Sequence, residues 1–368
     1  MALLKEGDHI RGTYEVERFL GEGAFAEVYR VKHRFLGRQA LKIFKRTGMT
    51  VEEIDEMLGE ATLLSRIGHP NIVRVFDANI VETDKGICGY FTMEYVPGGT
   101  LDKFWRSYGV NMVPIETSVG LLKQICRGLL MAHSEDPPII HRDIKPQNIL
   151  VGYEAEGLRA RLSDFGLARR VNPLTLLVSA AGTLAFKPPE TFLDPKADSR
   201  AADVYALGVT LYLLLTDQLP YEIDPVLGWS DIRAFDKVVL PPSEWNYEVD
   251  AAMDGIVLKC LAREPDARYQ SARELLDGLE SWSRPNKKNR LPHSKGLSSE
   301  MSKRVLGVHT PLNQEAAKKQ AKESLRIARE EGKLLEAADL MEEAFNQSPS
   351  LRERYASRVR LWRAGISM

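Results

Sequence analysis

Residues 140–150 read IHRDIKPQNIL, and fourteen residues after Leu150 the chain reads DFG, beginning at Asp164. This stretch sets two aspartates, a lysine and an asparagine in a fixed order: Asp143, Lys145, Asn148 and Asp164. Transfer of a phosphoryl group needs a carboxylate that orients the attacking hydroxyl, a cation on the transferred phosphate, and oxygen ligands for Mg²⁺. The four side chains can supply all three. An HRD tripeptide alone recurs by chance, whereas this compound pattern is highly specific.

Two glycines upstream, Gly21 and Gly23, lie in the stretch LGEGAFAEVYRV at residues 20–31. The alternating apolar residues on either side predict two strands joined by a tight turn. In such a turn glycine lets backbone N–H groups approach phosphates. The glycine pattern is weak evidence by itself.

A lysine and a glutamate follow in the order that a nucleotide site requires. Lys42 ends the alternating stretch QALK, and Glu60 follows eighteen residues later. Apolar residues around Glu60 recur at helical spacing, which predicts a helix that turns Glu60 inward. Because a buried carboxylate is costly without a cation, we expect Glu60 to pair with Lys42. Either residue alone would more often be a solvated surface charge.

With these motifs in this order, residues 11–281 resemble the eukaryotic-type (Hanks-type) serine/threonine protein kinases of bacteria. The resemblance covers about three quarters of the chain. The resemblance implies an α+β, two-lobed protein-kinase fold over residues 1–282, with a small β-rich N-lobe at about 11–95 and a larger helical C-lobe at about 96–282. A linker and an α-helical tail follow. It also implies phosphorylation of serine or threonine in proteins, with autophosphorylation, and the cofactors ATP and Mg²⁺, or Mn²⁺ in its place.

The resemblance assigns a role to each of these residues. Asp143 accepts the proton of the substrate hydroxyl, and Lys145 steadies the γ-phosphate. Asn148 and Asp164 hold the metal. Lys42 holds the α- and β-phosphates and pairs with Glu60.

The adenine site is also assigned by resemblance. The stretch HPNIVRVF at residues 69–76 resembles the strand that follows the helix of Glu60, and YFTMEYVPGGTL at residues 90–101 resembles the hinge. Met93 then is the gatekeeper, and the backbone from Glu94 to Val96 faces adenine. The nucleotide is further bounded by Leu20, Val28, Ala40 and Leu150. Each of these apolar side chains could equally belong to the ordinary core, because adenine pockets are lined by the same residue types.

The chain departs from the family pattern in three places. Ala26 takes the place of the third glycine of the loop and limits the backbone to ordinary φ values. In the stretch GTLAFKPPE at residues 182–190, Phe186 and Pro188 replace the usual tyrosine and alanine. The resemblance still assigns Thr183 a bond to the catalytic aspartate and lysine. It pairs Glu190 with Arg268.

Activation of the enzyme has two open interpretations. Arg142, just before the catalytic aspartate, is the cation that a phosphorylated loop engages in such kinases, and Thr175 and Ser179 are the candidate acceptors. Residues 174–181 are, however, unusually apolar for an exposed loop. Hydrophobic packing or a partner protein is therefore an alternative to phosphorylation.

Composition agrees with a globular protein of the cytoplasm. The chain has 368 residues, 44% of them hydrophobic and 27% charged. Its three cysteines have no metal-ligand spacing, which fits reduced core thiols. The longest apolar stretch, residues 204–215, is too short to span a bilayer and predicts a buried helix just after Asp203. By resemblance, Asp203 anchors the catalytic loop.

Charge divides the chain in two. Residues 1–282 hold 32 Lys and Arg against 41 Asp and Glu, and residues 283–368 hold 18 against 10. Residues 283–313 combine proline, glycine and serine with seven basic residues and one acidic residue, which predicts a flexible linker. The linker has no interleaved aromatic residues for base stacking, so nucleic-acid and membrane binding are the weaker interpretations.

Residues 314–368 predict a helical module. A first helix is expected to run to a turn near Gly332, a second to end at Pro349, and a third to span residues 355–362. The spacing resembles one tetratricopeptide repeat, although a plain helical hairpin fits nearly as well. A single repeat cannot bury its own apolar face, so the module must dock on the kinase lobes, self-associate, or begin a longer array. Recruitment of a protein partner through this tail is expected in addition to protein substrates.

Two other functions compete with a protein kinase. A pseudokinase scaffold would recruit partners without chemistry, but it usually lacks the lysine or one of the aspartates, all of which are present here. A small-molecule phosphotransferase generally lacks a peptide-docking segment like residues 182–190.

Overall fold

The computed structural model describes residues 2–23, 26–45, 53–54, 58–59, 67–109, 112–165, 184–194, 197, 199–221, 235–283 and 313–366. The chain divides into two compact units. The smaller unit comprises Met1–Val96 and Phe165–Ser179, and the larger comprises Pro97–Asp164 and Ala180–Met368.

The smaller unit is built on an antiparallel six-stranded sheet with the order β1-β2-β3-β4-β6-β5. The strands are β1 (His9–Ile10), β2 (Tyr14–Glu22), β3 (Ala26–His33), β4 (Gly37–Phe44), β5 (Val75–Thr83) and β6 (Gly86–Glu94). Alternate side chains of these strands, among them Tyr29, Leu41 and Tyr90, are almost fully buried in one cluster. The predicted β-rich small lobe is therefore confirmed.

Two details of this unit bear on the predicted nucleotide site. Strands β2 and β3 flank the glycine turn as predicted, and the amide of Gly23 donates to the carbonyl of Ala26. The prediction of a strand from residue 69 was wrong, since β5 begins only at Val75. Residues 69–72 form a turn instead, in which the amide of Ile72 donates to the carbonyl of His69, and Pro70 has no N–H for a ladder.

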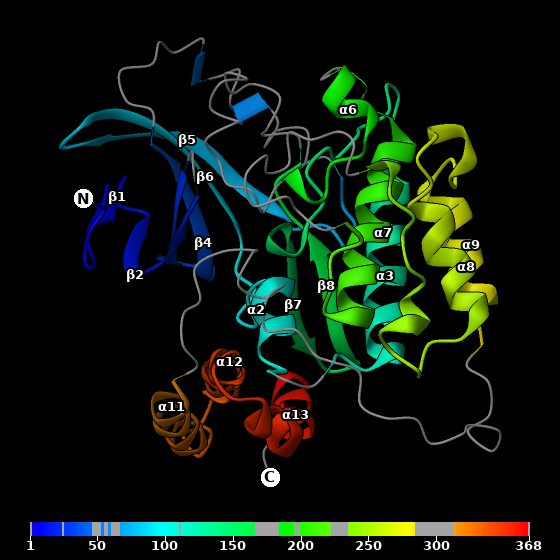
Figure 1. The fold of residues 1–368 in the computed structure, drawn as a ribbon. Coiled ribbons are helices and arrows are strands. Elements are labelled where there is room, and N and C mark those ends of the chain that lie inside the picture. Colours follow the sequence, from blue (N-terminus) through cyan, green and yellow to red (C-terminus); the bar gives the residue numbers. More distant parts are fainter. Residues whose placement is uncertain are drawn as a thin grey trace. The chain divides into compact units, whose positions relative to one another are not determined.

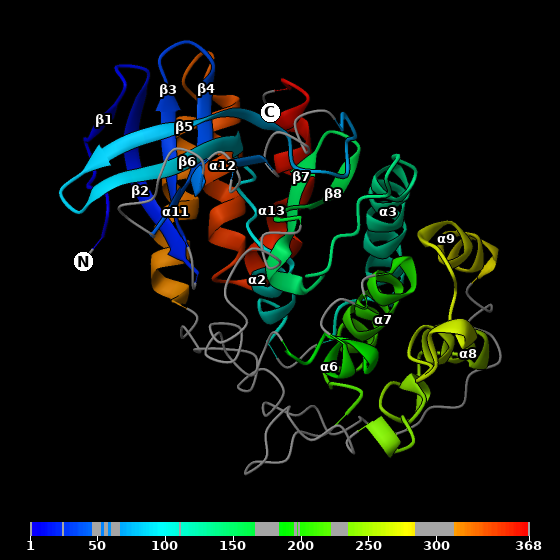
Figure 2. The ribbon, with the colours of Figure 1, turned by 90° about the horizontal axis from the view of Figure 1, so that it is seen from above.

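The larger unit is mainly helical, as predicted (Figure 1). Before the tail, its described residues form the helices α2 (Leu101–Arg106), α3 (Ile115–His133), α6 (Glu190–Leu193), α7 (Arg200–Thr216), α8 (Ala251–Cys260) and α9 (Ala272–Ser281). Helix α3 contacts α7 and α9 and also the hairpin of β7 (Ile149–Glu154) and β8 (Gly157–Leu162). Figure 2 shows α7 beside α3, with α8 and α9 next to them. Short 3-10 turns lie at Pro146–Asn148, Pro242–Glu244 and Pro265–Ala267.

Helix α7 is the central element of this unit, and it is buried over nearly its whole length. Ser199 caps its start by accepting the amide of Ala202, and Asp217 ends it in the left-handed conformation. A side chain at Gly208 would bring its Cβ within 2.5 Å of the Cβ of Cys260 on α8. Glycine therefore permits the close packing of α7 and α8. The buried helix predicted after Asp203 is confirmed.

Three helices form the tail: α11 (Gln314–Ile327), α12 (Leu334–Phe345) and α13 (Pro349–Arg363). Small side chains on α11 and α12 bring the two helices together, and the hydroxyl of Ser324 donates to the carbonyl of Ala337. The assignment of Pro349 as a helix terminator was wrong. α12 already ends at Phe345, and Pro349 begins α13 at its first position, where the missing N–H has no partner to lose.

Among the described residues, none of the helices combines the length and the apolar character that crossing a bilayer requires.

Candidate active site

Two predicted site residues, the catalytic Lys145 and the metal ligand Asn148, meet at the catalytic Asp143. Nζ of Lys145 donates to Oδ2 of Asp143 at 2.8 Å. Nδ2 of Asn148 donates to the same carboxylate oxygen at 2.9 Å and to the backbone carbonyl of Asp143 at 2.8 Å. The Asp143 side chain is only 18% exposed, so both donors act in partly desolvated surroundings. Charge-assisted bonds of this kind fix the orientation of a carboxylate.

The bonds of Asn148 also determine which of its atoms is available to a metal. Because the amide nitrogen is turned toward Asp143, the oxygen Oδ1 lies on the opposite side of the amide group. Asp164 lies two residues after the end of β8 in the same unit, with a left-handed backbone (φ +61°). An amide oxygen and a carboxylate are the hard oxygen donors that Mg²⁺ takes together with substrate phosphates. The donor set therefore fits a magnesium ion.

Asp203 of α7 holds the loop that carries Asp143 through hydrogen bonds to its backbone. Its two carboxylate oxygens accept the backbone amides of His141 and Arg142, each at 2.8 Å, and Oδ2 also contacts Nε2 of His133 at 3.0 Å. Arg142 has a left-handed backbone (φ +69°), an uncommon conformation for a non-glycine residue that the two amide bonds help to maintain. The predicted anchoring role of Asp203 is confirmed by these bonds.

His141 connects this loop to the DFG segment. Its Nδ1 accepts the amide of Asp143, and its Nε2 lies 3.0 Å from the carbonyl of Ser163. A carbonyl can only accept, so the proton resides on Nε2. Complete burial lowers the pKa of His141, since desolvation outweighs the nearby aspartates Asp203, Asp143 and Asp164. The ring is therefore a neutral spacer that joins the loop before Asp143 to the strand before Asp164.

The predicted ion pair of Glu190 and Arg268 is confirmed. Two guanidinium nitrogens of Arg268 donate to the two carboxylate oxygens of Glu190, at 2.7 and 2.8 Å. The Arg268 side chain is fully buried, and it also donates to the carbonyls of Ala262 and Arg263. The ring of Tyr205 lies 4.8 Å from the guanidinium carbon. This pair ties the start of α6 to the segment before α9.

Most of the residues predicted to hold the nucleotide lie on the sheet of the smaller unit. Lys42 on β4 is paired with Val28 on β3 and with Phe91 on β6, and its Nζ lies 6.0 Å from the Phe91 ring centroid. Ala40 is paired with Met93 in the same sheet. Leu150 lies on β7 in the larger unit, where it forms an isolated bridge with Thr100.

Further predicted members of this site have described surroundings as well. Leu20 and Gly21 lie at the end of β2, and Gly23 directly follows that strand. Met93 and Val96 are buried, and the amide of Glu94 donates to the carbonyl of Arg74 at 2.8 Å. The predicted residues Glu60, Thr175, Ser179 and Thr183 lie outside the described residues.

One contact at this site was not predicted from the sequence. Nζ of Lys187 donates to the backbone carbonyl of Arg142 at 2.6 Å, which links the stretch before Glu190 to the catalytic loop. A lysine beside two prolines carries no motif, so only its place three residues before Glu190 could have drawn attention to it.

Comparison with known proteins agrees with this geometry. Residues 14–278 match the family model described as the protein kinase domain. A probable serine/threonine-protein kinase of Clostridium acetobutylicum is 31% identical over 277 residues, which cover 74% of this chain and 40% of that protein. The serine/threonine-protein kinase PknB of Mycobacterium tuberculosis is 32% identical over 275 residues, which cover 73% and 42%.

Solved structures give the same picture for the fold. The crystal structure of the Mycobacterium tuberculosis PknI kinase domain is similar with a TM-score of 0.55 and 26% identity, covering 75% of this chain and 98% of that one. The chain spans about two fifths of the length of the curated relatives it matches.

Proposed function

This chain belongs to the protein kinase family, and on that premise we propose that it transfers the γ-phosphate of ATP to serine and threonine side chains of proteins, its own included. The observation that carries the proposal is the cluster in which Lys145 and Asn148 both bond Oδ2 of Asp143. A chain that kept only the kinase fold would have no need to orient this carboxylate with two donors. The serine/threonine names of the relatives support the acceptor class.

In the proposed reaction Asp143 orients the acceptor hydroxyl and takes its proton. Lys145, whose ammonium lies beside that carboxylate, steadies the γ-phosphate as charge shifts toward the leaving group. Bound Mg²⁺ would neutralise the phosphate oxygens, with Asn148 and Asp164 as its protein ligands. Mn²⁺ prefers similar oxygen donors and would serve in its place.

We propose the remaining nucleotide contacts from the sheet of the smaller unit. Lys42 lies on the central strand β4, which supports its proposed binding of the α- and β-phosphates. Glu60 is its expected partner. Gly21 and Gly23 flank the turn whose amides would approach the phosphates. The purine would be bounded by apolar residues of the predicted pocket, with the backbone from Glu94 to Val96 as its polar contact; these apolar residues are Leu20, Val28, Ala40, Met93 and Leu150.

The regulatory residues and the domain boundaries are also proposals. Arg142 would engage phosphorylated Thr175 or Ser179, and Thr183 would bond the catalytic residues. Residues 1–282 form the kinase domain, 283–313 a basic linker and 314–368 a tetratricopeptide-like module. The three free thiols are buried, which supports a reducing, cytoplasmic location.

A matched pair of lysine variants tests the proposal. Lys42→Ala is expected to lower label transfer from γ-labelled ATP to protein by on the order of 10²–10³, because it removes a preorganised cation from the phosphates. Lys32→Ala, on the exposed face of the neighbouring strand β3, should leave the rate nearly unchanged. If wild type and both variants all fail to transfer label, the chain is a scaffold and the proposal is wrong.

A further inference from the structure

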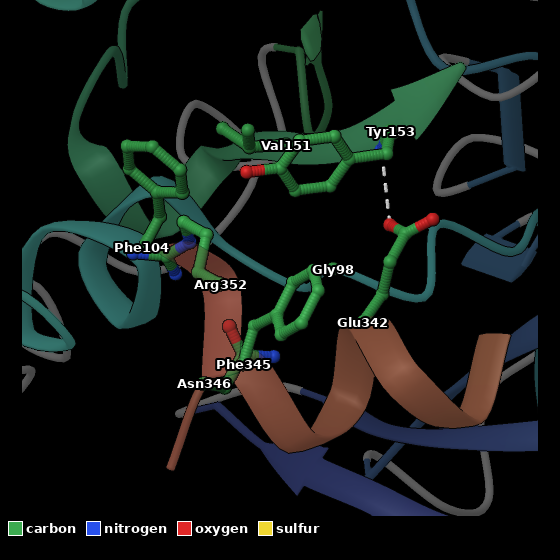
Figure 3. A pocket seen from close by; sticks show the side chains of 8 residues that line it. All are labelled: Gly98, Phe104, Val151, Tyr153, Glu342, Phe345, Asn346 and Arg352. Carbon is green, nitrogen blue, oxygen red and sulfur yellow. Dashed lines mark hydrogen bonds between the residues drawn. The ribbon is translucent and has the colours of Figure 1, made fainter. Parts of the chain in front are cut away.

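The helical tail packs directly on the rest of the larger unit. The rings of Tyr153 on β7 and Phe345 on α12 meet edge to face, with centroids 5.7 Å apart (Figure 3). The guanidinium carbon of Arg352 on α13 lies 4.4 Å from the ring centroid of Phe104 and 5.1 Å from that of Tyr108. Arg352 is 7% exposed, so this cation–π contact is largely desolvated and correspondingly strong.

The tail also provides a hydrogen-bond acceptor at the outer edge of β7. β8 pairs along one edge of β7, and the other edge carries the isolated bridge between Leu150 and Thr100. On the other edge the amide of Val151 donates to the carbonyl of Gly99 at 2.8 Å, and the amide of Tyr153 donates to Oε2 of Glu342 at 2.9 Å. Buried N–H groups need an acceptor, and an open strand edge invites pairing with another chain. A carboxylate from α12 therefore supplies what a neighbouring strand would otherwise provide.

The position of Glu342 is itself fixed within the tail. Its side chain is 1% exposed, and its other oxygen accepts Nη2 of Arg363 at 2.7 Å. Arg363 also pairs with Asp339 at 2.7 Å. The carboxylate thus joins α12 and α13 of the tail while it caps the strand of the larger unit.

The contact includes Gly98 and Gly99, near the start of the larger unit. A Cβ at Gly98 would lie 2.1 Å from the carbonyl oxygen of Val151 and 3.2 Å from Oε2 of Glu342. Gly99 adopts a φ of +74° beside Asn346 of the tail. Only glycine fits between β7 and α12 at position 98. The tail therefore holds the segment that follows Val96, where the smaller unit ends.

We propose that residues 313–366 are an intramolecular ligand of the rest of the larger unit, which closes the outer edge of β7 and fixes Gly98 and Gly99 through Glu342, Phe345 and Arg352. This proposal rests on contacts within the chain and not on the proposed kinase activity. While the tail is docked, these three side chains are unavailable to other proteins. A partner of the tail must use another face of its helices or displace it from β7.

Cleavage of the connecting segment tests this docking in the full-length protein. A protease site is inserted within residues 284–312 and cut after folding, and gel filtration with light scattering then follows the two pieces. We expect them to remain together with the mass of one chain. Separation of the wild-type pieces at micromolar concentration, or a particle with the mass of two chains, would overturn the proposal.

Two arginine variants on α13 make the test specific. Arg352→Ala should raise the dissociation constant of the cut pieces at least about tenfold, since a desolvated cation–π contact is lost. Arg354→Ala, which removes an exposed arginine from the same helix, should not. In the uncut chain, hydrogen exchange at the Tyr153 amide should quicken in the first variant only. Equal effects of the two variants would contradict the assigned surface.

The pH dependence of docking provides a second test of the same contact. Burial raises the pKa of Glu342 from 4.5 to about 7, because desolvation outweighs Arg363 and the Tyr153 amide, and Asp339 adds to the rise. The docked state then binds a proton more readily than the undocked state, so docking weakens as pH rises from 4.5 to 7. Between pH 5.5 and 7.5 we therefore expect the dissociation constant to rise. Glu342→Gln should flatten this profile, and an unchanged slope would show that Glu342 does not face the interface.

Discussion

Asp143→Asn is expected to lower the rate of phosphoryl transfer by about 10²–10³ while leaving the fold intact. The substitution keeps the shape of the side chain but removes the charge that Lys145 and Asn148 orient. An amide cannot accept the proton of the attacking hydroxyl. The expected change is therefore in kcat, with little change in the affinity for ATP, and steady-state kinetics with nucleotide titration measures both.

An exposed aspartate in the same unit provides the control for this variant. Asp277→Asn on α9 makes the same chemical change on the surface and should keep the wild-type rate. If Asp143→Asn transferred phosphate as fast as Asp277→Asn, Asp143 would have no role in the reaction.

The second large effect is expected on stability. Glu190→Gln removes the charge that faces the fully buried guanidinium of Arg268. Loss of one partner of a buried ion pair costs about 3–5 kcal/mol, because the remaining charge is left without compensation in a region of low polarity. Urea denaturation, followed by the fluorescence of the tryptophans in the larger unit, should report a decrease of this size in unfolding free energy.

An exposed ion pair in the same unit serves as the control for the buried Glu190–Arg268 pair. Glu280 accepts from Arg127 at 2.7 Å, but both side chains are nearly half exposed. Glu280→Gln should cost no more than about 1 kcal/mol, as exposed ion pairs do. The double variant Glu190→Gln with Arg268→Met should recover part of the loss, since it also removes the buried charge. Similar losses for Glu190→Gln and Glu280→Gln would show that burial does not strengthen the Glu190–Arg268 pair.

Much of the larger unit's site could be predicted from sequence because its parts lie close together along the chain. Asp143, Lys145 and Asn148 fall within six residues, so a short motif implies the contacts that the structure contains. Asp203 and the Glu190–Arg268 pair are distant in sequence, and only the family resemblance could connect them. Burial of a charge then explains why each is paired.

The docking of the tail could not be predicted in the same way. The sequence left three alternatives open for the apolar face of the helical module, and the structure has the first of them, with Tyr153 packed on the tail core. The bond from Tyr153 to Glu342 joins residues 189 positions apart and uses a backbone amide, which every residue except proline carries. A strand edge of this kind leaves no pattern of side chains in the sequence.

The element boundaries that were wrong have local causes. β5 begins at Val75 and not at residue 69, because Pro70 and the His69 turn occupy the residues before it. Pro349 begins a helix where it was expected to end one. The same absence of an N–H suits proline to the position after a helix and to the first turn of the next, so its sequence position alone could not decide between them.

The proposed reaction is phosphoryl transfer to aliphatic hydroxyls with Asp143 as the base. The most direct test incubates the purified full-length chain with γ-labelled ATP, Mg²⁺ and an added protein substrate, then hydrolyses the protein and identifies the labelled amino acids. We predict label on serine and threonine, more than one phosphate transferred per enzyme chain, and almost none with Asp143→Asn. Label on tyrosine alone, or equal labelling by wild type and Asp143→Asn, would contradict the claim.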